Sequence, residues 1–141
     1  MLKDDTALIV IDVQESFRHR DYWNPADVSA FSDRMQSLAD GARQAGIPIV
    51  QIFHVEDSGV FSLASGHVRT LTPLAIEPDA VFHKRRHSAL VGSGLPIWLT
   101  ERGIRRAGLI MPRASPPDRR ALLRPSRCAR SGRRARARCA P

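Results

Sequence analysis

Two aliphatic runs with a helical pattern between them place the strongest constraint on the fold of this 141-residue chain. Residues 6–14 read TALIVIDVQ and residues 47–54 read IPIVQIFH, and such near-continuous runs are typical of parallel strands covered on both faces. Between them, residues 24–46 predict a helix with Asn24 as its N-cap and Gly46 just beyond its end. The sequence therefore predicts a strand–helix–strand crossover, the unit from which parallel sheets are built.

The helix is expected to bury one side against the sheet. Its apolar residues recur at steps of three and four, which places them on one face: Val28, Phe31, Met35, Leu38 and Ala42.

The alternation of strands and helices continues after a long loop. Residues 79–84 and 105–111 predict two further strands, and residues 95–103 predict a short helix between them. The predicted fold class is therefore α/β, an open parallel sheet with flanking helices in a Rossmann-like, three-layer arrangement.

The net charge of +8 is confined to the end of the chain. Residues 1–111 contain 12 basic and 13 acidic residues, a net charge of −1, whereas residues 112–141 contain ten arginines and one acidic residue, a net charge of +9. The second segment also contains five prolines and few large aliphatic residues. We therefore expect a domain over residues 1–111 and a disordered Arg/Pro-rich tail over residues 112–141.

Composition also narrows the partners and the location. Ten arginines could neutralise nucleic-acid phosphates, but the tail has no aromatic residues to stack on bases, so we expect no specific nucleic-acid binding. No apolar stretch approaches the ~20 residues of a membrane helix, and the first residues do not resemble a signal peptide. Both cysteines, Cys128 and Cys139, lie in the tail. These features indicate a cytoplasmic protein without membrane contact.

Polar residues follow the predicted strands at their carboxyl ends, where open α/β sheets bind ligands. Asp12 follows the first strand and Lys84 ends the third. Together they would form an acid/base pair, in which the carboxylate exchanges a proton with a nucleophile or a leaving group. Gln14, Phe17 and His54 are candidates for the wall of the substrate pocket, and a purely structural role is the alternative for each.

Two motifs resemble a known family. LIVIDVQESF (8–17) and VFHKRRHSAL (81–90) make residues 6–111 similar to the isochorismatase-like cysteine hydrolases, a superfamily that includes nicotinamidases and N-carbamoyl-amide hydrolases. The resemblance implies that Asp12 is the general acid/base and that Lys84 tunes it and helps to hold the substrate. It further implies hydrolysis of a small-molecule amide or carbamoyl bond without a cofactor, and a homo-oligomer in the full-length family.

The chain departs from the family after the fourth predicted strand. The family has a G-x-x-T-x-x-C-V/C segment there, whose cysteine is the nucleophile, whereas this chain reads PRASPP over residues 112–117. We therefore expect an incomplete sheet and an inactive copy, and we interpret the tail as a shifted reading frame or an aberrant terminus. Ser115 lacks an evident base, and nothing would hold Cys128 over the crevice.

Several alternatives stay open. Some family members without the cysteine hydrolyse a vinyl ether with the aspartate as acid, so Asp12 could support isochorismate-type chemistry. The chain could instead be a basic nucleic-acid-binding protein, or it could fail to persist as a folded protein because of an unpaired sheet edge. Nicotinamidases bind a metal through Asp-x-His and a further His, but FHVEDSG (53–59) lacks that arrangement, so no metal is expected.

Overall fold

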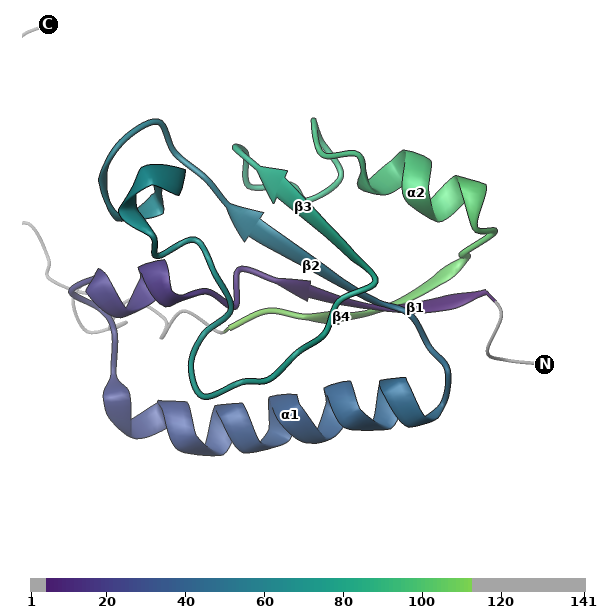
Figure 1. Cartoon of the computed structure of the whole chain (residues 1–141), viewed down its shortest axis with the longest axis horizontal. Helices are drawn as coiled ribbons and strands as arrows, with labels where there is room; N and C mark the ends of the chain where they lie inside the picture. The colour runs from purple at the N-terminus through teal and green to yellow at the C-terminus, as the bar shows by residue number, and fades with distance from the viewer. Residues whose placement is uncertain (1–4, 113–141) are drawn as a thin grey trace, which may run out of the picture.

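The computed structural model describes residues 5–112, which form a four-stranded parallel sheet between two helices (Figure 1). The strand order is β3-β2-β1-β4, and every neighbouring pair is parallel. The strands are β1 (Thr6–Ile11), β2 (Ile49–His54), β3 (Ala80–Lys84) and β4 (Arg106–Ile110). The predicted α/β fold with an open parallel sheet is confirmed.

One helix lies on each face of the sheet. The helices are α1 (Val28–Gln44) and α2 (Leu95–Glu101), and they lie on opposite sides of the strands in Figure 1. The predicted start of the first helix is a 3-10 turn over Pro25–Asp27, where the Asn24 side chain accepts a hydrogen bond from the backbone N of Ala26 at 3.1 Å. Gly46, with a φ of 70°, provides the left-handed residue that ends this segment.

Two apolar clusters fill the space between the sheet and its helices. The cluster beneath α1 contains Leu8, Val10, Val13, Met35, Ala39, Ala42, Ile49 and Leu71. The cluster beneath α2 contains Ala7, Ile9, Ile11, Val50, Ile52, Leu95 and Trp98. Since residues of β1 and β2 pack into both clusters, the structure explains why their sequences are aliphatic without alternation.

The predicted apolar stripe of α1 is wrong at one position. Leu38 is 54% exposed, whereas Ala39 is 3% exposed and packs beneath the helix. Met35 and Ala42 are buried as predicted. The residues of α1 that are buried are Ser32, Met35, Ala39 and Ala42. The line of closest approach to the sheet therefore runs on the Ala39 side of the stripe, and Leu38 points outward.

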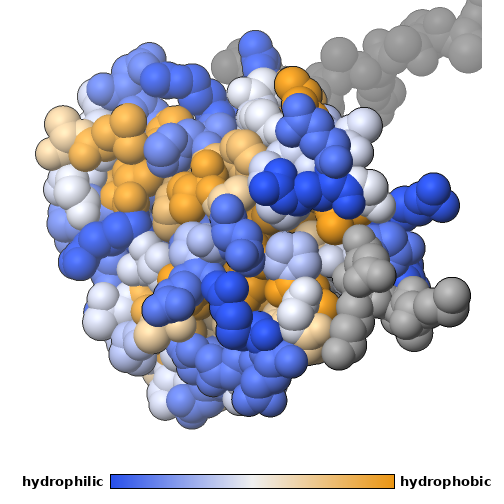
Figure 2. Space-filling model, turned by 45° about the vertical axis from the view of Figure 1, so that its right-hand side comes forward, coloured by the Kyte–Doolittle hydropathy of each residue, from blue (hydrophilic) through white to orange (hydrophobic). Residues whose placement is uncertain are grey.

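Within residues 5–112, the two edges of the sheet are β3 and β4. Residues 106–109 of β4 are all exposed, and Leu109 has 63% of its surface accessible. In the view of Figure 2, apolar residues reach the surface in several orange areas bordered by hydrophilic side chains. Across residues 5–112, no helix has both the length and the apolar character needed to cross a bilayer.

Candidate active site

Asp12 stands at the carboxyl end of β1, where the main chain leaves the sheet. Its backbone N donates the last β1–β2 hydrogen bond to the carbonyl of Ile52 at 2.9 Å. Its φ of 60° lies in the left-handed region, which aspartate and asparagine adopt more readily than other non-glycine residues. The chain therefore turns away from β2 immediately after Asp12.

The structure brings Asp12 and Lys84 together. The Lys84 Nζ lies 3.0 Å from the Asp12 Oδ2, and the two side chains are 4% and 22% exposed. β2 separates β1 from β3, so the two strands are roughly 10 Å apart. The long lysine side chain spans this distance and crosses the end of β2 to reach the carboxylate. The pair satisfies an ammonium group that would be costly to bury alone.

The second oxygen of the Asp12 carboxylate is differently placed. Oδ1 is buried and has no hydrogen-bond partner among the described residues. An ionised carboxylate oxygen is an acceptor only. The carboxylate therefore has one oxygen paired with Lys84 and one buried oxygen whose acceptor capacity is unused among the described residues.

Gln14 is buried, with 1% of its surface accessible. Its Nε2 donates to the carbonyl oxygen of His54 and to the Oγ of Ser16, both at 3.0 Å. Its Oε1 accepts a hydrogen bond from the backbone N of His54 at 2.7 Å. The amide thus joins the segment after β1 to the end of β2.

Phe17 and His54 both pack against the same aromatic ring. The Phe17 ring lies 5.0 Å from that of Phe61, and the His54 ring lies 5.5 Å from it, each in an edge-on arrangement. His54 Nε2 lies 3.4 Å from a carboxylate oxygen of Glu56, while its Nδ1 is buried without a partner among the described residues. Phe17 lines the cleft described next, whereas His54 is not among the residues that line it.

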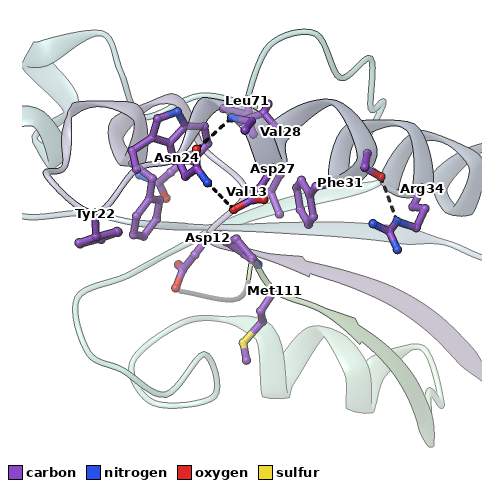
Figure 3. Close-up of a pocket in the computed structure, with 16 residues that line it drawn as sticks. Asp12, Val13, Tyr22, Asn24, Asp27, Val28, Phe31, Arg34, Leu71 and Met111 are labelled. Carbon is purple, nitrogen blue, oxygen red and sulfur yellow. Dashed lines mark hydrogen bonds between the residues drawn. The ribbon is translucent and has the colours of Figure 1, made fainter. Parts of the chain in front are cut away.

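A cleft of about 630 Å³ opens beside Asp12 (Figure 3). Asp12 and Met111 border it on one side, and residues at the start of α1, including Phe31, border it on the other. Tyr22 and Trp23 add aromatic surface to its wall. Sequence analysis did not identify these two as cleft residues. The available signal was a Tyr-Trp pair directly before a helix N-cap, in an otherwise polar segment.

Glu15 holds the loop that covers the end of β1. Its Oε1 accepts a hydrogen bond from the backbone N of Thr72 at 2.6 Å, and its other oxygen lies 3.2 Å from Arg18. Burial acts to raise the pKa of Glu15, but the bonds from Thr72 and the charges of Arg18 and Arg69 outweigh it, so the pKa lies below its ordinary value. Glu15 is therefore a charged anchor beside the site.

The described residues offer little for a metal or a thiol nucleophile. Within residues 5–112 no three His, Cys, Asp or Glu side chains gather closely enough to hold a metal ion. Residues 1–127 contain no cysteine. The two nucleophile alternatives, Ser115 and Cys128, and the Arg/Pro-rich tail beyond Pro112 lie outside the described residues.

Comparison with known proteins gives a consistent result. A family model described as the isochorismatase domain matches residues 6–110. A protein of the isochorismatase family from Chromobacterium violaceum superposes with a TM-score of 0.64 at 22% sequence identity over 77% of this chain. A protein assigned as an isochorismatase from Burkholderia xenovorans gives 0.64 at 30% identity over 74% of the chain. An N-carbamoylsarcosine amidase from Thermoplasma acidophilum gives 0.62 at 20% identity over 75% of the chain.

The matched structures are longer than the region that they share with this chain. The chain covers 57% of the C. violaceum protein, 52% of the B. xenovorans protein and 66% of the T. acidophilum amidase. The family match ends at residue 110, which is also the last residue of β4. The shared region therefore includes all four strands and both candidate catalytic residues.

Proposed function

Since the chain belongs to the isochorismatase family, we propose that Asp12 and Lys84 form the acid/base part of a hydrolase site for a small-molecule amide or carbamoyl C–N bond. The observation that carries the proposal is the 3.0 Å ion pair between them, at the carboxyl end of the sheet and beside an open cleft. Ligands bind at this end of open α/β sheets. The similarity to an N-carbamoylsarcosine amidase adds support for the bond type.

In this proposal Asp12 transfers the proton and Lys84 positions it. Lys84 pairs with Oδ2 and holds the carboxylate at the border of the cleft, where the carboxylate exchanges a proton with the reacting groups. It would accept the proton of an attacking nucleophile and return it to the nitrogen of the departing amine, which keeps the proton balance of the cleavage. The substrate body would lie in the cleft, against Phe17, Phe31 of α1 and the Tyr22–Trp23 pair that precedes the helix.

We further propose that this 141-residue chain does not complete that reaction. The family resemblance implies a cysteine nucleophile shortly after the fourth strand, and the sequence has none between residues 1 and 127. Without a thiol in that position Asp12 has no protein nucleophile to deprotonate, and no acyl-enzyme can form. Asp12 and Lys84 would then be a correctly built but unused half of a catalytic site.

A chimera tests the competence of the pair. A C-terminal segment from a family member that carries the G-x-x-T-x-x-C-V/C motif would be joined after Met111, which supplies the cysteine that the family resemblance implies there. We expect hydrolysis of N-carbamoyl or primary-amide probes that iodoacetamide abolishes, and a loss of about 10²- to 10⁴-fold in Asp12→Asn and Lys84→Met. Asparagine is chosen because it tolerates the left-handed φ at this position.

The exposed ion pair between Arg85 and Asp57 provides a matched control. It lies next to Lys84 in sequence, and its side chains are 63% and 90% exposed. Arg85→Met and Asp57→Asn should leave the rate within about twofold, because exposed pairs contribute little. A folded chimera that hydrolyses none of the probes, or one that keeps its rate in Asp12→Asn, would contradict the proposed reaction. Amide hydrolysis by the 141-residue chain, thiol-dependent above all, would contradict its inactivity.

The place of Asp12 on the wall of the cleft favours a second candidate, hydrolysis of a vinyl ether with Asp12 as the acid. This reaction needs a proton donor and water but no thiol. Incubation of the 141-residue chain with isochorismate separates the two candidates. Turnover that disappears in Asp12→Asn supports the vinyl ether reaction, and its absence leaves the thiol-dependent proposal as the only one of the two.

A further inference from the structure

The end of β2 lacks a main-chain partner on its β1 side. In a parallel ladder, alternate residues of a strand direct both the N–H and the C=O to the same neighbour. On β2 the carbonyl of Ile52 accepts from Asp12, so His54 is the next residue whose peptide groups face β1. By then the chain has turned away at Asp12. Buried peptide groups left in this way must find another partner.

Gln14 provides that partner with its side chain. Its amide donates to the carbonyl of His54 at 3.0 Å and accepts from the N–H of His54 at 2.7 Å. One donor and one acceptor of the primary amide thus replace the peptide group that a longer β1 would have supplied. The second N–H donates to Ser16, whose hydroxyl in turn donates to the carbonyl of His67 at 3.0 Å. Both donors of the Gln14 amide are occupied, so none is free for a ligand.

The residue that follows His54 is bound to the strand that carries Lys84. His54 is the register partner of Lys84 in the β2–β3 pair, and the N–H of Val55 donates to the carbonyl of Lys84 at 2.9 Å. The Asp12–Lys84 ion pair crosses directly over this end of β2. The distance between Lys84 Nζ and Asp12 Oδ2 therefore depends on how closely the ends of β1, β2 and β3 are held together.

We propose that Gln14 is a positioning residue, whose amide holds the carboxyl ends of β1 and β2 at the spacing at which Asp12 and Lys84 meet. This inference rests on the proposed function only in giving the ion pair a catalytic meaning. Gln14 also lines the cleft, so this role through the backbone of His54 is added to the pocket-wall role expected from the sequence. Replacing the amide by an apolar group would leave both His54 peptide groups unpaired and let the strand ends separate.

The composition of the chain allows a direct measurement. Lys3 and Lys84 are its only lysines, so a ¹⁵N-resolved NMR spectrum of side-chain ammonium groups contains two signals. A buried, ion-paired ammonium exchanges its protons slowly and is observed at low temperature and mildly acid pH. We expect a Lys84 signal in the unmodified chain that disappears in Asp12→Asn, which identifies it as the signal of the pair.

Gln14→Leu should also abolish this signal, and the rate of Lys84 acetylation relative to Lys3 should rise by about tenfold as the pair opens. Gln51→Leu is the matched control. Gln51 is a buried amide of β2 that bonds to Thr70 at 2.9 Å, and Thr70 forms a β-bridge with Gln14, so Gln51→Leu perturbs the same loop but leaves both His54 peptide groups paired. It should lower stability while leaving the Lys84 signal and its acetylation unchanged. Gln14→Glu keeps the acceptor for His54 and should give an intermediate rate.

The outcomes separate this inference from the proposed function. A Lys84 signal that persists unchanged in Gln14→Leu and Gln14→Glu would overturn the positioning role, and so would equal effects of Gln14→Leu and Gln51→Leu. If Gln14→Leu does not fold, Gln14→Glu alone is the test: a weakened Lys84 signal supports the positioning role, and an unchanged signal overturns it. A Lys84 signal unaffected by Asp12→Asn would instead show that Lys84 is not paired with Asp12, and this would contradict the proposed function. None of these measurements requires turnover.

Discussion

At the scale of single residues, Glu15 gives the clearest pH dependence. Its pKa lies below the ordinary value, so its stabilising contribution is complete above that value and is lost as the pH falls through the folded-state pKa. We expect Glu15→Gln to lower the free energy of unfolding by about 1.5–3 kcal/mol at neutral pH, as for a hydrogen bond to a charged group. Denaturant unfolding at neutral pH and near pH 3 should show the difference between variant and parent shrinking in acid.

Glu77 is a suitable control for this experiment, because it is an exposed glutamate in the loop before β3. Glu77→Gln should change the free energy of unfolding by less than about 0.5 kcal/mol at either pH. A Glu15→Gln deficit that is the same at both pH values would show that packing, rather than the carboxylate charge, stabilises the loop at Thr72.

The site residues differ in how well the sequence could predict their positions and contacts. The sequence could place Asp12 and Lys84 near each other, because the carboxyl ends of all parallel strands lie at the same end of the sheet. The sequence could not predict the contacts of the Gln14 amide. They depend on the path of the chain after the left-handed turn at Asp12 and on the loop that contains His67. Local turns of this kind leave no periodic signal in the sequence.

At the scale of elements, α1 shows how far a periodic pattern can locate a buried face. The spacing of its apolar residues predicted the helix and its buried side. It also predicted that Leu38 is buried, but Ala39 is the buried residue and Leu38 is exposed. We expect Met35→Ala, at a 1% exposed position, to lower the free energy of unfolding by about 2–5 kcal/mol. Leu38→Ala, at a 54% exposed position, should cost less than about 1 kcal/mol. Denaturant unfolding of both variants provides the comparison, and equal costs would contradict the observed orientation of α1.

At the scale of the whole molecule, the sequence was sufficient to predict the sheet and its covering helices. It was not sufficient to predict which strands are exposed to solvent. The aliphatic runs of β1 and β2 predicted strands buried on both faces, and both are. A strand was also predicted over residues 105–111, yet residues 106–109 of β4 are exposed and, within residues 5–112, it pairs with β1 alone. Burial of a strand depends on its neighbours, and these lie outside its own sequence.

The exposed edge predicts how the chain behaves in solution. Free edge strands with apolar side chains pair with other chains, and natural proteins often protect such edges with lysine. Leu109, on the sheet face that carries α2, is 63% exposed on β4, and Leu63, in a 3-10 turn, is 62% exposed away from any strand. We expect Leu109→Lys to raise the soluble fraction of the expressed chain by about twofold or more, and Leu63→Lys to leave it unchanged. Sedimentation of lysates and light scattering of the purified chain measure this effect. Because both substitutions add the same charge at the same exposure, an equal gain from both would assign the aggregation to net charge rather than to the free edge of β4.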